Sequence, residues 1–107
     1  MDMKIPGRKT LVEANGKRYL ILTDSRYQKA LGYCIACSVE EFGQENVTKV
    51  KVNVNETSFF IDVARVELIE LADEVVIQGQ ISDIEFRKVL QILIPILGGE
   101  LLFTDSI

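Results

Sequence analysis

The sequence of 107 residues predicts a mainly β domain, in which five to seven short antiparallel strands form a curved sheet or partial barrel closed by a C-terminal helix. Short β-type segments separated by turn residues fill the first three-quarters of the chain. A helical spacing of apolar residues begins only after Ser82. The length is that of one domain, so we assign residues 1–107 to a single unit.

Turn signals separate the first strands. A short strand over 10–13 is followed by Asn15-Gly16, which strongly predicts a hairpin. The apolar runs 18–23 and 32–39 are typical of strands covered on both faces. The polar stretch 24–31 between them predicts a loop or a short helix.

The middle of the chain has the clearest β pattern. Residues 47–54 alternate valines with polar side chains, which predicts a half-exposed antiparallel strand after a loop. Further strands are predicted over 58–63, 65–71 and 74–81. The alternation slips at Leu68-Ile69, which indicates a bulge or bend there.

A helix is predicted from the capping box Ser82-Asp-Ile-Glu85 onward. Pro95 is expected to kink or end it, Gly98-Gly99 to stop it, and residues 100–103 to form a possible last strand. Isoleucines lie off the main apolar stripe, which indicates a helix that is either deeply buried or in contact with a second subunit, and we predict a homodimer. That stripe consists of Phe86, Val89, Leu90, Leu93 and Leu97.

The composition limits the chemistry. The chain has no His, which excludes Ser–His and Cys–His nucleophile pairs and most transition-metal sites, and we predict no cofactor and no metal. Cys34 and Cys37 lie in an apolar strand pattern and are predicted to be buried small side chains on opposite faces. No apolar leader or membrane-spanning run is evident, so we expect a cytoplasmic protein.

Charge is unevenly distributed along the chain, although the net charge is −4. Residues 1–30 carry seven cations and three anions, whereas residues 31–107 carry five cations and thirteen anions. A basic first third on an acidic body is able to direct a polyanion such as RNA to one face. An uneven but merely solvated surface is the alternative interpretation.

The block Glu13-Ala-Asn-Gly16-Lys-Arg18-Tyr precedes an apolar run. It resembles the motif Glu-Gln-x-Gly-x-Arg-Pro of the MazF/PemK toxin family, which shares its fold with the CcdB toxins. Tyr27 and the block 32–40 are similar to the family's Tyr, Gly, apolar strand and Cys-Pro-x-Thr. The likeness continues through Asp62, Arg65 and the terminal helix, in order, along nearly the whole chain.

The resemblance implies an SH3-like barrel and a homodimer that cleaves single-stranded mRNA without a metal and is controlled by an antitoxin protein. Arg18 matches the family's Arg, whose implied role is to stabilise the charged phosphorane or to transfer protons. The family's Thr is replaced by Glu40, with Ser38 close by, so Arg18, Glu40 and Ser38 are the candidate catalytic residues. The candidates for substrate binding are Glu13, Gly16, Lys17 and Tyr27.

An alternative function remains open on the same fold. Glu40 and the acidic body favour a non-catalytic dimeric module that binds a protein partner, such as an antitoxin-like peptide or gyrase. Arg18 has a corresponding alternative, an ion pair with Glu13 across the hairpin.

Overall fold

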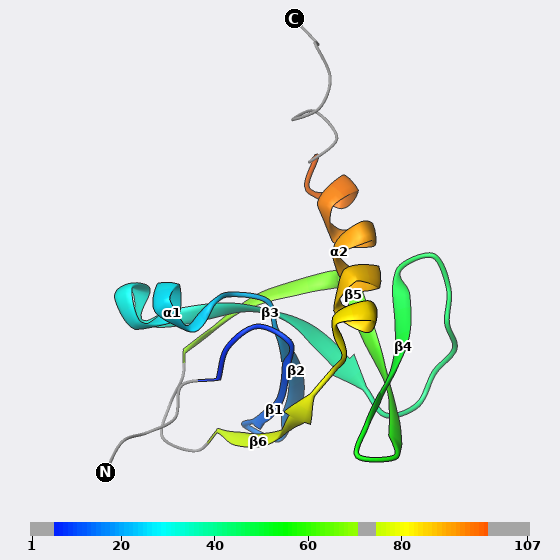
Figure 1. Ribbon diagram of the computed structural model, residues 1–107, viewed down its shortest axis with the longest axis horizontal. Coiled ribbons are helices and arrows are strands. Elements are labelled where there is room, and N and C mark those ends of the chain that lie inside the picture. Colours follow the sequence, from blue (N-terminus) through cyan, green and yellow to red (C-terminus); the bar gives the residue numbers. More distant parts are fainter. Residues whose placement is uncertain (1–5, 71–74, 99–107) are drawn as a thin grey trace, which may run out of the picture.

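The computed structural model describes residues 6–70 and 75–98 and contains one six-stranded antiparallel sheet (Figure 1). The strand order is β4-β5-β3-β2-β1-β6, so β4 and β6 are the two edges. The predicted fold class is therefore confirmed. The elements are β1 (Thr10–Ala14), β2 (Lys17–Ile21), α1 (Ser25–Leu31), β3 (Tyr33–Glu40), β4 (Lys49–Val54), β5 (Thr57–Glu70), β6 (Val76–Gln80) and α2 (Asp83–Ile96).

The sheet curls until its two edges meet, which makes it a partial barrel. The Asn55 side chain donates a hydrogen bond of 2.9 Å to the Gln78 carbonyl, joining the β4–β5 turn to β6. Gly79 permits this approach, because a Cβ atom there would lie 2.5 Å from the Val54 side chain. A larger residue at this position would force the two edges apart.

Side chains of the two sheet faces form separate apolar clusters. The concave face packs against α2 through Phe86, Val89 and Leu93, which are buried as the helical stripe predicted. Cys37 lies in this cluster and Cys34 in the one on the convex face. Burial raises the pKa of Cys34 to about 11 and that of Cys37 to about 12, so both thiols stay protonated near neutral pH.

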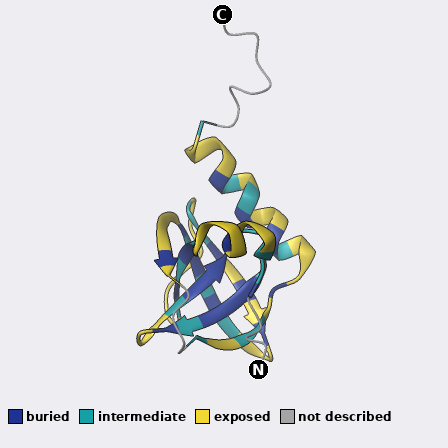
Figure 2. Cartoon of the chain, turned by 90° about the vertical axis from the view of Figure 1, so that its left-hand side faces the viewer, coloured by how far each residue is buried: buried dark blue, intermediate teal, exposed yellow. Residues whose placement is uncertain are grey.

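The N-terminus of α2 is capped as predicted and is also tied to the sheet. The Ser82 hydroxyl accepts from the Glu85 backbone N–H, and the Glu85 carboxylate accepts from the Ser82 N–H. The other Glu85 oxygen accepts from the Asn53 N–H at 2.8 Å, on the edge strand β4. The helix continues through Pro95 and ends at Ile96, one residue later, because the proline falls in its last turn. Figure 2 shows this last turn standing away from the sheet with exposed residues.

Two local expectations are corrected by the structure. Residues 58–63 and 65–71 do not form two strands, because β5 is one strand of 14 residues. Its bulge is not at Leu68-Ile69: Cys37 pairs with Val66 and Ser38 with Asp62, so residues 63–65 of β5 have no opposite partner. The break in alternation at Leu68-Ile69 is a consequence of this bulge. After the bulge β5 leaves the apolar cluster of the concave face, and Leu68 becomes exposed.

The segment before β3 forms a short helix, one of the two structures predicted for residues 24–31. Asp24 caps α1 and Gly32 ends it with φ 82°. The buried Gln28 side chain fastens this helix through hydrogen bonds to the Pro6 carbonyl and the Thr23 hydroxyl. The strand expected at 100–103 lies outside the described residues. Neither of the helices in the described part of the chain has the length and apolar character of a membrane span.

We predict that Glu85→Ala lowers the free energy of unfolding by about 1 to 3 kcal/mol, because it leaves the Ser82 and Asn53 N–H groups without their carboxylate acceptor. Urea denaturation followed by circular dichroism measures the change. Gln91→Ala, on the exposed face of the same helix, is the control and should leave stability within about 0.5 kcal/mol. Equal midpoints for the two variants would contradict the capping argument.

Candidate functional site

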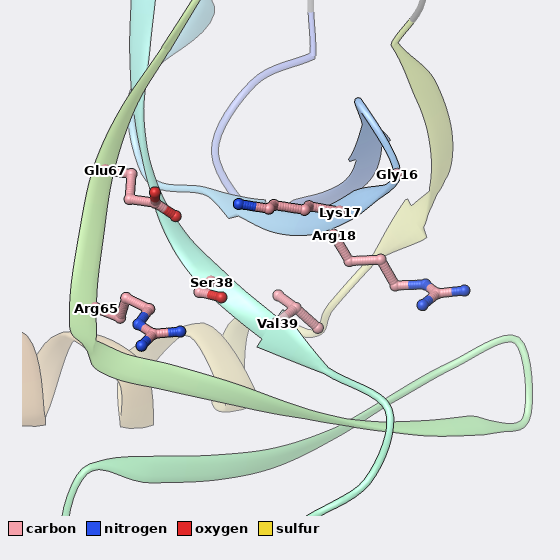
Figure 3. A pocket seen from close by; sticks show the side chains of 7 residues that line it. All are labelled: Gly16, Lys17, Arg18, Ser38, Val39, Arg65 and Glu67. Atoms are coloured by element: carbon pink, nitrogen blue, oxygen red, sulfur yellow. The ribbon is translucent and has the colours of Figure 1, made fainter.

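A groove of about 560 Å³ opens where β2, β3 and β5 run side by side (Figure 3). It combines cationic, hydroxyl and carboxylate side chains from three strands. The residues that line it are Gly16, Lys17, Arg18, Ser38, Val39, Arg65 and Glu67.

The β1–β2 hairpin places Lys17 at the groove. Asn15 and Gly16 have φ values of 54° and 75°, the left-handed conformation that the Asn-Gly pair predicted. The tight turn leaves Lys17 as the first residue of β2, opposite Ala14. The Lys17 side chain is exposed and extends from the convex face of the sheet.

The bulge in β5 places the other polar groups. Ser38 lies on β3, directly beside the three unpaired residues of β5, the last of which is Arg65. Glu67 follows two residues later and returns to the regular register opposite Ala36. In Figure 3 the Lys17 ammonium, the Arg65 guanidinium and the Glu67 carboxylate all point toward the space around Ser38.

The groove is cationic although the chain is acidic. Three of its lining residues are cations and one is an anion. Within residues 6–70 and 75–98, no ion pair includes Lys17, Arg65 or Glu67. Lys17 and Arg65 are therefore available to an anionic ligand. A phosphodiester is an anion that a Lys–Arg pair beside a hydroxyl binds well.

Arg18 borders the groove, but its guanidinium turns the other way. Figure 3 shows it pointing away from Ser38. Its Nη2 lies 2.7 Å from Glu41 Oε1, and its Cζ lies 5.7 Å from the centre of the Phe59 ring. Its Nε is buried and has no hydrogen-bond partner among the described residues. The Arg18 side chain is 29% exposed, so solvent still reaches part of the guanidinium.

The alternative pairing of Arg18 with Glu13 is not the one in the structure. The two residues are opposite one another in the register of β1 and β2. The carboxylate of Glu13 instead accepts a hydrogen bond of 3.2 Å from the Gln78 side chain. Gln78 lies at the register irregularity between β1 and β6, which directs it toward Glu13.

The groove thus brings together four of the seven candidate residues, namely Gly16, Lys17, Arg18 and Ser38. Glu40 lies outside the lining and accepts a hydrogen bond of 3.3 Å from Lys49 Nζ. Tyr27 is a largely exposed residue of α1. Of Glu40, which aligns with the family's Thr, and the nearby Ser38, only Ser38 lines the groove.

Arg65 and Glu67 were not among the candidates, although Arg65 carried part of the family resemblance. The break in alternation at Leu68-Ile69 indicated that β5 is irregular. It lies after Arg65 and Glu67 in the sequence, so it did not identify these two residues. Among the described residues, no group of three or more His, Cys, Asp or Glu side chains is placed to hold a metal ion.

Comparison with solved structures identifies the fold. The MazE–MazF complex from Deinococcus radiodurans has a chain that matches with a TM-score of 0.80 and 18% identity, covering 89% of this chain and 98% of that one. An endoribonuclease from a mycobacterial species matches with a TM-score of 0.74 and 19% identity, over 90% of this chain and 94% of that chain. No protein-family model and no curated protein sequence matches the chain. At these identities the likeness defines the class by its fold: the chain has the fold of the MazF toxins.

Proposed function

We propose that this protein is the toxin of a toxin–antitoxin pair and that it cleaves single-stranded RNA as a metal-independent endoribonuclease. The observation that carries the proposal is the groove in which Lys17, Arg65 and Glu67 converge on Ser38. The shared fold supports it, because solved structures with this fold include endoribonucleases.

A single strand fits this groove better than a duplex. The cations come from two strands of a curved sheet and surround one hydroxyl, which suits one phosphate rather than the two backbones of a helix. The bases of a single strand remain free for contacts beside the groove. Arg65 supplies a planar fork for two phosphate oxygens, and Lys17 adds a mobile point charge.

The proposed reaction is an internal attack by the ribose 2′-oxygen on the adjacent phosphorus. Glu67 takes the proton from the 2′-hydroxyl, and the bond from phosphorus to the 5′-oxygen breaks. The leaving 5′-oxygen takes a proton from Lys17, which gives a 2′,3′-cyclic phosphate and a 5′-hydroxyl. Arg65 and the Ser38 hydroxyl donate to the non-bridging oxygens, whose negative charge grows in the transition state.

Arg18 has a second place in the proposal. The Arg18 guanidinium is paired with the Glu41 carboxylate. A phosphate group would compete with this carboxylate for the N–H donors of Arg18. We expect RNA to displace Glu41 and to bring Arg18 onto the phosphate next to the reacting one. The role that the family resemblance implied for Arg18 would then require this ion pair to open.

The proposed partners are an antitoxin and a second copy of the chain. The antitoxin is supported by solved complexes of the same fold, such as the mycobacterial endoribonuclease bound to its cognate antitoxin, with a TM-score of 0.73 and 17% identity over 87% of this chain and 95% of that chain. The homodimer is supported by the exposed apolar side chains at the end of α2 and on β5. They are Ile94, Ile96, Leu97, Val66 and Leu68.

One observation favours the non-catalytic binding module instead. The Arg18 guanidinium is held by Glu41 and Phe59 and is turned away from Ser38, which is how a structural arginine would be placed. A module of this kind would bind a protein partner and leave RNA intact.

Incubation of the purified protein with a long single-stranded RNA in EDTA separates the two functions. The nuclease produces discrete fragments that end in 2′,3′-cyclic phosphate. We predict that Glu67→Gln and Arg65→Ala each lower the cleavage rate by about 100-fold or more. Lys29→Ala, which removes an exposed cation from α1, is the control and should cleave at the original rate. Intact RNA in all samples would support the binding module.

Glu41→Gln tests the role of Arg18. The amide leaves Arg18 without its anionic partner, so we predict a severalfold gain in RNA affinity, measured by fluorescence anisotropy. Glu56→Gln removes the same charge from the β4–β5 turn and should raise affinity much less. If both variants bind equally well, general repulsion explains the effect and the specific competition is wrong.

The homodimer is tested by light scattering. We predict twice the chain mass for the protein and a monomer for Ile94→Glu, because a carboxylate on the apolar end of α2 would have to be buried without a partner. Lys88→Glu, on the same helix, should remain dimeric. A monomeric mass for the unmodified protein at tens of micromolar, roughly the range of weak dimers, would count against this interface.

A further inference from the structure

We propose that Phe42 is a stacking platform for a nucleobase next to the groove, which makes the β3–β4 loop (residues 41–48) part of the RNA-binding surface. The inference rests on the proposed function and extends it to a subsite that none of the catalytic residues forms. It concerns how a single strand is gripped and not how its phosphodiester is broken.

The exposure of Phe42 is the first observation. Among the described residues, the two most exposed large apolar side chains are Val47 at 87% and Phe42 at 84%, and both belong to this loop. A phenylalanine so exposed forgoes the favourable burial that its ring would gain in a core. An exposed ring beside a cationic groove is the arrangement found where single-stranded nucleic acid is bound by stacking.

The β3–β4 loop is fastened at its start. In the free protein the Glu41 carboxylate, directly before Phe42 in the chain, contacts Arg18 at 2.7 Å, and this pair is the one proposed to open when RNA binds. Glu40 is held by Lys49 at 3.3 Å. A Cβ atom at Gly43, directly after Phe42, would lie 3.5 Å from Glu40 Oε2 and 3.7 Å from the Phe60 ring, so both groups lie close to this part of the loop.

The same loop is fastened at its end. The Asn46 side chain accepts from the Thr48 backbone N–H at 2.9 Å, and Glu45 accepts from the Lys51 N–H at 3.1 Å. Backbone hydrogen bonds of 3.3 Å join Asn46 and Lys49 in both directions. Because the loop is anchored on both sides, it holds Phe42 in an exposed position. A ring held in this way loses little conformational entropy when a base stacks on it.

The position of Phe42 selects the ligand. Val39 lines the groove and precedes Phe42 by three residues, so their Cα atoms are at most about 10 Å apart. The intervening Glu41 contacts the guanidinium of Arg18, which points away from Ser38. A base attached to the phosphate that Arg18 is proposed to bind, next to the reacting one, is therefore within reach of the ring. Phenylalanine has no hydrogen-bonding group, so the subsite accepts any base and contributes affinity more than sequence preference.

The chain offers a clean reporter because it contains no Trp. Phe42→Trp introduces a single indole at the proposed platform, and Val47→Trp introduces one at an equally exposed position of the same loop. The probe is a short mixed-sequence single-stranded RNA with methylated 2′-hydroxyls, which cannot undergo the proposed attack. We expect the probe to quench the emission of Phe42→Trp strongly and to leave that of Val47→Trp nearly unchanged.

Affinity gives the second measurement. Phe42→Ala should weaken binding of the same probe by roughly tenfold, whereas Val47→Ala should not change it. Both side chains are exposed, so neither substitution should alter the circular dichroism or the melting temperature.

The outcomes separate the two proposals. If the unmodified protein binds the probe but Phe42→Ala binds it equally well and Phe42→Trp is not quenched, the stacking subsite is wrong and the proposed function stands. If the unmodified protein neither binds the probe nor cleaves RNA, the proposed function fails and the subsite with it. A Phe42→Trp emission that responds only to a protein partner would assign the ring to that partner and overturn the RNA subsite.

Discussion

The bulge in β5 is the constraint on which the rest of the molecule depends. Three residues of β5 lie opposite a single step of β3, between the partners of Cys37 and Ser38. Before the bulge, Phe59 and Ile61 point into the concave core. After it the strand leaves that core, and Arg65 and Glu67 line the groove around Ser38. The same bend exposes Val66 and Leu68, so the groove and the proposed dimer surface have one origin.

Two carboxylates next to the groove each form an ion pair with a nearby cation. Glu40 and Glu41 follow one another at the end of β3, and each holds a different cation, Lys49 and Arg18. Both pairs are partly exposed, and such pairs are individually weak, so a strongly charged ligand can exchange with them. Glu40 and Glu41 are thus already paired, whereas Lys17, Arg65 and the groove carboxylate Glu67 form no ion pair within the described residues. Two unpaired cations and one unpaired anion of the groove therefore meet an incoming polyanion.

The edge of the sheet is closed to strand addition at β4. The backbone N–H groups of Lys49, Lys51 and Asn53 are bonded to the Asn46 carbonyl, to Glu45 and to Glu85. Alternate residues of an edge strand present their N–H groups outward, where a foreign strand would pair. Because these N–H groups are bonded to the chain's own acceptors, they are not available to a foreign strand at β4.

Sequence alone determined the features that depend on neighbouring residues. The Asn15-Gly16 turn, the capping box at Ser82 and the alternating valines of β4 were predictable because each is stabilised within a few residues. The fold class followed from their order. Of the seven candidate site residues, Gly16, Lys17, Arg18 and Ser38 lie together in the groove, because three of them are neighbours in the hairpin and Ser38 is on the adjacent strand, whereas Glu40 and Tyr27 lie outside it.

Tertiary structure alone decided the features that depend on register between distant strands. The place of the bulge, the pairing of Arg18 with Glu41 instead of Glu13, and the addition of Arg65 and Glu67 to the groove belong to this group. The alternation of a strand records only which residues face an apolar layer, and β5 leaves that layer at its bulge. Opposite partners some thirty residues away in the chain are selected by packing of the whole barrel, which no local pattern encodes.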